Sequence, residues 1–154
     1  MKDINFNFEN NRFNFRVGAY ICCNGKMLLQ TSPQFSFWNL VGGRVKMGES
    51  TLDAIKRELN EELGITKCNP HLIKVAETFF DWQGVSVQEL FFVYQVDLPK
   101  SYYKKLDNFL VLDSDGEHTN WFDEHKLKQI VCKPEFIYEL PKSKTLTHQI
   151  LKNK

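Results

Sequence analysis

The segment 50–64 limits most strongly what this 154-residue chain can fold into, because its pattern predicts an amphipathic helix with one apolar and one acidic face. Ser50 is a typical N-cap residue, and Asp53 places a negative charge in the first turn, where it favours the helix dipole. Gly64 suits the left-handed residue that ends many helices. At about 100° per residue, one stripe forms the predicted core face, and it holds Leu52, Ile55, Leu59 and Leu63.

A second face of this predicted helix carries Glu58, Glu61 and Glu62 at positions i, i+3 and i+4, with Ala54 one turn earlier. Like charges at these spacings destabilise a helix, and more so when partly buried, as Glu62 should be beside the apolar stripe. Arg57 can reach Glu61, but one arginine cannot neutralise three carboxylates. A divalent cation can, and hard oxygen ligands select Mg²⁺ or Mn²⁺. We therefore expect Mg²⁺ or Mn²⁺ as the cofactor.

The rest of the chain predicts strands before and after this helix. Period-two alternation and turn residues predict strands over 4–8, 13–21, 27–30, 38–41, 72–80, 85–96 and 120–122. Turns are predicted at 24–25 and 83–84, and a polar loop over 99–118. A short helix is expected near Asp123 and a helical stretch near Glu135, which Pro141 should break or kink. The order predicts one mixed α+β domain with helices packed on a sheet.

The composition excludes several classes of function. Lys and Arg number 20 against 19 Asp and Glu, and a net charge of +1 argues against a nucleic acid or a membrane surface as the main partner. No apolar run approaches the roughly 20 residues of a membrane span, and residues 1–11 lack the apolar core of a signal peptide. The four cysteines form no Cys-x-x-Cys pair, which is typical of reduced thiols in a cytoplasmic protein.

The stretch from Gly43 to Ile65 resembles the sequence box of the Nudix family of MutT-like hydrolases. That box is a glycine, five residues, a glutamate, seven residues, Arg-Glu, an aliphatic residue, any residue, two glutamates, any residue, a glycine and an aliphatic residue. The chain fills these places without a departure, with Gly43, Glu49, Arg57, Glu58, Leu59, Glu61, Glu62, Gly64 and Ile65. Seven fixed residues at roughly 5% usage match by chance about once in 10⁹ placements, so the resemblance is specific.

This resemblance implies a fold, an activity and a set of site residues. The fold is an α/β/α sandwich around a mixed sheet, here as a single domain over 1–154. The activity is hydrolysis of a pyrophosphate linkage in a nucleoside diphosphate derivative. The family's metal ligands fall on four groups of this chain: Glu58, Glu61, Glu62 and the Gly42 carbonyl. Arg57 is expected to orient the glutamates and to pair with Glu49.

The general base of the family varies in position, so two residues stay open for that role. One is Glu58 on the helix, and the other is Glu117, in the polar loop before Trp121. Glu89 interrupts the apolar face of its strand, and a buried carboxylate needs a partner, so it is a candidate to face the site. Trp38 and Trp82 could stack a base, although aromatic residues are more often part of a core.

Three other functions remain as alternatives. A nucleotide-sensing module without catalysis should lose metal glutamates, and this chain keeps them. An isomerase acting on a prenyl diphosphate would want an additional acid or thiol over the carbon skeleton. Messenger-RNA decapping usually has a supporting basic surface, which the charge balance does not give.

The substrate is expected to be a nucleoside triphosphate or a similarly compact nucleotide. Some members of the family carry a proline or tyrosine about fifteen to eighteen residues past the box, and residues 80–83 hold neither. The expected partner is therefore a small nucleotide, and the protein is expected to be a monomer or a homodimer.

Overall fold

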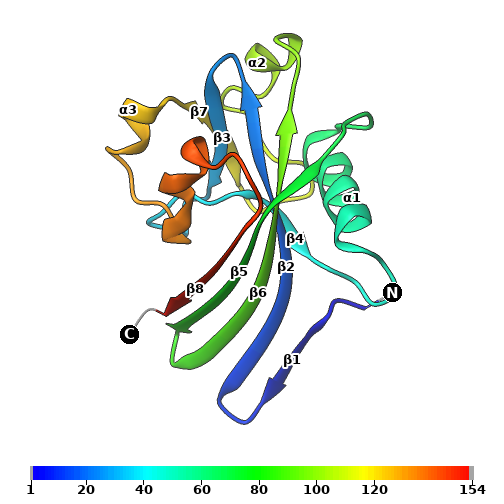
Figure 1. Cartoon of the computed structure of the whole chain (residues 1–154), viewed down its shortest axis with the longest axis vertical. Coiled ribbons are helices and arrows are strands. Elements are labelled where there is room, and N and C mark those ends of the chain that lie inside the picture. The colour runs from blue at the N-terminus through cyan, green and yellow to red at the C-terminus, as the bar shows by residue number, and fades with distance from the viewer. Residues whose placement is uncertain (1, 153–154) are drawn as a thin grey trace.

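The computed structural model describes residues 2–152, in which eight strands form one mixed sheet with helical segments against both faces (Figure 1). The strands are β1 (Asn5–Phe8), β2 (Asn11–Cys23), β3 (Lys26–Thr31), β4 (Val41–Arg44), β5 (His71–Trp82), β6 (Val85–Asp97), β7 (His118–Phe122) and β8 (Thr147–Lys152). The helical segments are α1 (Thr51–Leu63), α2 (Ser101–Lys105), α3 (Glu124–Leu127) and the 3₁₀ helix η1 (Glu135–Lys142). Within residues 2–152, no helix is long and apolar enough to cross a bilayer.

Strand β2 organises the sheet, because its 13 residues pair with three antiparallel neighbours along one edge and with β6 along the other. Strands β1, β4 and β3 follow one another along the first edge, opposite 11–14, 16–19 and 21–23 of β2. The pairing with β6 is parallel, β5 joins β6 antiparallel, and β8 joins β5 parallel. The sheet is therefore mixed, as the sequence predicts.

The two predicted hairpin turns are confirmed by their backbone angles. Asn24 and Gly25 have φ values of 53° and 73°, and Gln83 and Gly84 have values of 50° and 81°. Two consecutive positive φ values match the right-handed twist of the flanking strands. These turns fix the register of β2 with β3 and of β5 with β6.

Alternation along the strands creates two cores, one on each face of the sheet. Helix α1 covers the first, and its buried residues are Ala54, Ile55, Leu59 and Leu63. The 3₁₀ helix η1 covers the second through Phe136, Ile137 and Leu140 (Figure 1). This layering confirms the predicted α+β sandwich.

Helix α1 begins and ends as predicted. The Ser50 side chain accepts a hydrogen bond from the Asp53 N–H at 3.0 Å, and Gly64 ends the helix with φ 69°. The assignment of Leu52 to the core face was wrong, because its side chain is 37% exposed. Ala54 is fully buried instead, so this small residue makes the first contact of the helix with the core.

Three features differ from the sequence prediction. The strand expected over 38–41 begins at Val41 and continues through both glycines to Arg44, while Trp38 forms only an isolated bridge. The predicted loop 99–118 contains the short helix α2. Pro141 lies one residue from the end of η1 and does not break it, because a proline there removes a single backbone donor.

Strand β8, like helix α2, is an element that the sequence did not predict. Its side chains are mostly exposed, so it lacks the apolar alternation of the other strands. Polar contacts hold it, since the buried Lys74 ammonium donates to Thr147 at 3.1 Å and to Gln149 at 3.0 Å. A strand stabilised by hydrogen bonds to a distant lysine carries little signal in its own residues.

Replacing Leu59 with alanine should destabilise the protein by roughly 2–5 kcal/mol, because its side chain is fully buried beneath α1. Leu52→Ala, on the same helix, removes the same atoms from an exposed site and should cost less than about 1 kcal/mol. Urea unfolding at neutral pH measures both changes. Equal losses of unfolding free energy would contradict the placement of these two leucines.

Candidate active site

Arg57 is the centre of a hydrogen-bond network that joins α1 to the segment before it. Its Nε and Nη2 atoms donate to the two carboxylate oxygens of Glu49, at 3.1 and 2.7 Å. Nη1 donates to Glu58 at 2.9 Å and to Glu61 at 3.2 Å. Nη2 also donates to the Arg44 carbonyl at 3.0 Å. The predicted ion pair of Arg57 with Glu49 is confirmed, and the same guanidinium ties two further carboxylates to β4.

Hydrogen bonds between Arg57 and Glu49 outweigh the opposing effect of burial on both charges. Their side chains are 19% and 8% exposed. Hydrogen bonds from Arg57, and one from the Lys46 N–H, hold the pKa of Glu49 below its ordinary value of 4.5. The hydrogen bonds to Glu49 in turn raise the pKa of Arg57. Both groups therefore stay charged over the whole neutral range.

Two glycines bring β4 against the acidic face of α1. A Cβ atom on Gly43 would overlap the carboxylate of Glu58, and one on Gly42 would overlap the Val17 carbonyl oxygen. Because neither glycine carries a side chain, β4 pairs closely with β2, where Gly42 lies opposite Gly18. The backbone of the Gly42–Gly43 pair, which includes the carbonyl expected as a metal ligand, thus lies beside the acidic face.

Glu62 is the most perturbed carboxyl group of this acidic face. Burial raises its pKa to about 9, and hydrogen bonding and charge repulsion from Glu58 act in the same direction. The negative charge of Glu117 raises it further, while Arg16 acts in the opposite direction. The sequence prediction that Glu62 is partly desolvated is confirmed.

Glu117 lies in a loop that is hydrogen-bonded to the end of α1. The Leu112 N–H donates to the Glu62 carbonyl at 3.0 Å, and the Val111 N–H donates to the Glu117 carbonyl at 2.8 Å. These bonds bring Glu117 close enough for its charge to act on Glu62. Within residues 2–152, the Glu117 carboxylate forms no hydrogen bond or ion pair of its own.

The donor chemistry of the acidic face fits a divalent cation. The carboxylates of Glu58 and Glu117 are close enough for their charges to act on Glu62, and Glu61 is half exposed on the same helix. Among the described residues, no three acidic, histidine or cysteine side chains already converge as a ligand set, and Glu58 and Glu61 accept hydrogen bonds from Arg57 instead. Crowded hard oxygen donors are the groups that Mg²⁺ and Mn²⁺ prefer.

A cavity of about 660 Å³ opens on the η1 face of the sheet. Its floor consists of side chains that share one face of β2, β6 and β5, in three rows that follow the strand register. These rows are Arg12–Val87–Phe80, Asn14–Glu89–Thr78 and Arg16–Phe91. Aromatic and cationic groups form the wall, and they are Phe35, Phe37, Trp82, Arg44 and Lys133. The size suits a nucleoside-sized ligand.

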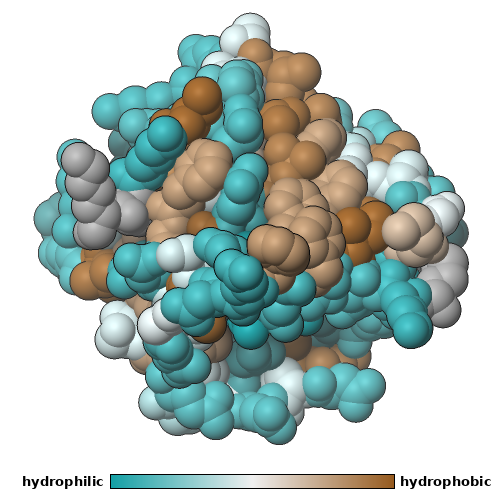
Figure 2. All heavy atoms as spheres, turned by 90° about the horizontal axis from the view of Figure 1, so that it is seen from below, coloured by the Kyte–Doolittle hydropathy of each residue, from teal (hydrophilic) through white to brown (hydrophobic). Residues whose placement is uncertain are grey.

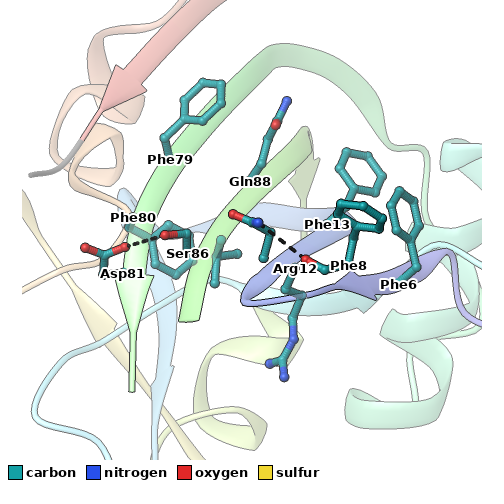
Figure 3. Close-up of a pocket in the computed structure, with 11 residues that line it drawn as sticks. Phe6, Phe8, Arg12, Phe13, Phe79, Phe80, Asp81, Ser86 and Gln88 are labelled. Atoms are coloured by element: carbon teal, nitrogen blue, oxygen red, sulfur yellow. Dashed lines mark hydrogen bonds between the residues drawn. The ribbon is translucent and has the colours of Figure 1, made fainter. Parts of the chain in front are cut away.

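A second hollow lies on the opposite face of β2, β6 and β5, near the β1–β2 and β5–β6 turns. Phe6 and Phe8 are 59% and 69% exposed there, and Figure 2 shows hydrophobic side chains gathered on this end. Phe6 and Phe13 stack with ring centroids 5.3 Å apart beside a smaller hollow of about 440 Å³. Figure 3 shows Arg12 pointing away from Phe13 and Gln88. Arg12 lines both cavities, and its Nε donates to Asn7 Oδ1 at 3.0 Å.

Among residues 2–152, several residues that line the larger cavity carry buried polar atoms without a hydrogen-bond partner. These atoms are Asn14 Oδ1, Asn39 Oδ1, Thr78 Oγ1 and Arg16 Nε. Glu89 is only 5% exposed, and it pairs with Arg16 at 3.7 Å. Buried polar groups are normally hydrogen-bonded, so a cluster of unsatisfied ones points to a polar ligand. The expectation that Glu89 faces a site agrees with this position.

The two candidate tryptophans lie in different surroundings. Trp82 lines the cavity and meets Phe35 and Phe37 edge to face, with centroid distances of 6.5 and 6.3 Å. Trp38 packs against Phe122 at 4.8 Å and is not among the cavity residues. Trp38 is therefore a half-buried residue that packs against the second core, and we keep the proposed role of stacking a base for Trp82.

Sequence reasoning missed most residues of the cavity. Arg12, Asn14 and Arg16 occupy every second position of β2, which on an isolated strand predicts a solvent-exposed face. The signal available in the sequence was that Glu89 and Phe91 of β6 alternate in the same way as these residues of β2. It becomes informative only when the parallel register of β2 and β6 is known.

The sandwich fold, with its acidic helix after a glycine pair, defines the Nudix class of proteins. The family model described as NUDIX domain matches residues 12–141. The chain belongs to the Nudix family.

Similar proteins support the same family. The chain is 43% identical over 47 residues to an uncharacterised Nudix hydrolase of Bacillus subtilis, YvcI, with 30% of each chain covered. It is 45% identical over 53 residues to the CTP pyrophosphohydrolase of Escherichia coli, covering 32% of this chain and 39% of that one. These matches span about a third of the curated relatives' lengths.

Solved structures are similar over most of the chain. A MutT protein from Bacillus halodurans has a TM-score of 0.71 at 19% identity, covering 92% of this chain and 90% of that one. The Escherichia coli ORF135 protein has a TM-score of 0.54 at 20% identity, covering 90% and 92%. At these identities the likeness shows the fold alone.

Glu49→Gln should lower the free energy of unfolding at pH 7 by more than the roughly 1 kcal/mol of an exposed ion pair, because Arg57 stays half-buried without its main partner. The folded pKa of Glu49 lies below the ordinary 4.5, so its contribution is present above that value and is lost as pH falls through the folded pKa. The difference between wild type and variant should therefore shrink below about pH 4.5. Urea unfolding across this range tests it, with the exposed Glu9→Gln as the control, and a constant difference would contradict the ion pair.

Proposed function

We propose that this protein hydrolyses a pyrophosphate linkage in a nucleoside diphosphate derivative, with Mg²⁺ or Mn²⁺ held by Glu58, Glu61 and Glu62. One observation carries the proposal: a crowded acidic helix face, ordered by Arg57, adjoins a cavity lined by cations and aromatic rings. The charge of Arg16, which lines the cavity, acts on Glu62 and so links the two regions.

The cavity supports a nucleotide over other anions. The Phe35, Phe37 and Trp82 rings offer apolar faces to a base, and base–aromatic stacking contributes about 1–3 kcal/mol per contact. Arg16 and Arg44 lie opposite each other on β2 and β4, on the cavity side. Guanidinium groups bind phosphate oxygens in a bidentate manner, so this pair suits the diphosphate.

The residues of the acidic face have distinct tasks in this reaction. A divalent ion, when bound, would supply positive charge beside the phosphate oxygens and make a water more acidic. Arg57 holds Glu58 and Glu61 in fixed directions through its hydrogen bonds. Glu117, whose carboxylate has no partner of its own among the described residues, accepts the proton of the attacking water.

A compact nucleoside triphosphate is the substrate class that we propose. Residues 80–83 lack the proline or tyrosine found in some family members with larger substrates. The similar Escherichia coli enzyme is named a CTP pyrophosphohydrolase, which makes CTP the first triphosphate to test. A metal–phosphate interaction, not the base, should supply most of the binding energy.

The direct test is a comparison of kcat/KM for the common nucleoside triphosphates, ADP-ribose, nucleotide sugars and diadenosine polyphosphates with Mg²⁺. We expect a triphosphate to be preferred, with release of pyrophosphate or phosphate that chelation of the metal abolishes. Glu61→Gln should lower turnover by orders of magnitude with an unchanged melting temperature, because the half-exposed carboxylate serves the metal more than the fold. Near-normal turnover of this variant, or a clear preference for ADP-ribose, would contradict the proposal.

Glu117→Gln should depress kcat and remove the acidic limb of the pH–rate profile, because an amide cannot accept the proton of the attacking water. The neighbouring Asp115→Asn variant, in the same loop, is the control and should keep both. A profile of Glu117→Gln that matches wild type would return the role of general base to Glu58.

A further inference from the structure

The middle row of the cavity floor is polar on three adjacent strands. Asn14 on β2 lies opposite Glu89 on β6, and Glu89 lies opposite Thr78 on β5. Their exposed fractions are 8%, 5% and 3%. All three line the cavity, and in the described part of the chain neither Asn14 Oδ1 nor Thr78 Oγ1 has a hydrogen-bond partner. A ligand bound in this cavity would place its polar edge against this row.

Glu89 sets the chemistry of this row, because an ionised carboxylate can only accept hydrogen bonds, whereas amides and hydroxyls both donate and accept. Within residues 2–152, no hydrogen bond reaches the Glu89 carboxylate. Arg16 lies at 3.7 Å, which balances its charge but is too long for a hydrogen bond. A nearly buried carboxylate in this state favours a ligand that brings hydrogen-bond donors.

We propose that Glu89 makes this site selective for nucleobases that carry an exocyclic amino group. This inference rests on the proposed function and names the base class within it. Adenine, cytosine and guanine offer amino N–H donors to the carboxylate. Uracil and thymine instead flank their single imide N–H with two carbonyl oxygens, and these would face the Glu89 oxygens without a hydrogen bond.

Cytosine and uracil isolate this effect, because the two bases have nearly the same shape and differ at the 4-position. With CTP and UTP under one Mg²⁺ condition, kcat/KM should favour CTP by about tenfold or more, as expected when a buried charged acceptor is left unpaired. The pair 5-methyl-dCTP and dTTP should show the same preference, since a methyl group is present in both.

Glu89→Gln should reduce the ratio of kcat/KM for CTP over UTP to within about threefold, because an amide can turn either its N–H₂ or its oxygen to the base. The control is Glu77→Gln on β5, whose half-exposed side chain pairs with His148 and is not among the cavity residues. This variant should keep the wild-type ratio. Equal kcat/KM for CTP and UTP in the wild type, or an unchanged ratio in Glu89→Gln, would overturn the inference.

A binding measurement decides the question without catalysis and without a variant. Titration calorimetry of wild-type protein with CMP and with UMP, in the absence of metal, should show tighter binding of CMP by about tenfold. Equal affinities would overturn the base preference. Failure to hydrolyse any nucleotide would contradict the proposed function alone, since the two monophosphates would still report on the role of Glu89.

Discussion

The hydrogen bonds of Arg57 are the interaction on which the rest of the site depends. A guanidinium presents its donors in a fixed plane, and here they reach Glu49, Glu58, Glu61 and the Arg44 carbonyl. A lysine offers a single compact charge and could not hold these acceptors in different directions. The loop, the helix and strand β4 therefore keep one relative geometry, although three carboxylates crowd one helix face.

Glu62 is the carboxyl group whose ionisation this crowding disfavours most. Arg57 donates hydrogen bonds to Glu49, Glu58 and Glu61, but Glu62 lies against Glu58 and the apolar stripe, and burial raises its pKa to about 9. The stability of this face is thus supplied by the half-buried pair of Arg57 and Glu49 on one side. On the other side it is supplied by Leu59 and Leu63 beneath the helix. A strained acidic cluster on a firmly packed helix is typical of functional sites.

The parts of the molecule that the sequence predicted are those whose contacts lie close together along the chain. Helix α1 with its caps is set within one segment by periodicity, and the pair of Glu49 with Arg57 followed from the resemblance of that same segment to the Nudix box. The cavity has the opposite character. Asn14 and Glu89 become neighbours only through the parallel pairing of β2 with β6, and no local pattern in either strand specifies that register. Strand β8 was missed for a related reason, since its stabilising contacts come from Lys74.

The acidic face and the cavity lie on different faces of the sheet, and two arginines connect them. Arg16 and Arg44 are neighbours across β2 and β4, and both line the cavity. The Arg44 carbonyl accepts a hydrogen bond from Arg57, while the charge of Arg16 opposes the rise in the pKa of Glu62. The cavity, the two arginines and the acidic face follow one another in space. An elongated ligand with a flat polar base at one end and an anionic group at the other matches this arrangement. Its base would lie between the aromatic wall and the row containing Glu89, and its phosphates would lie at the arginines nearest the glutamates of α1.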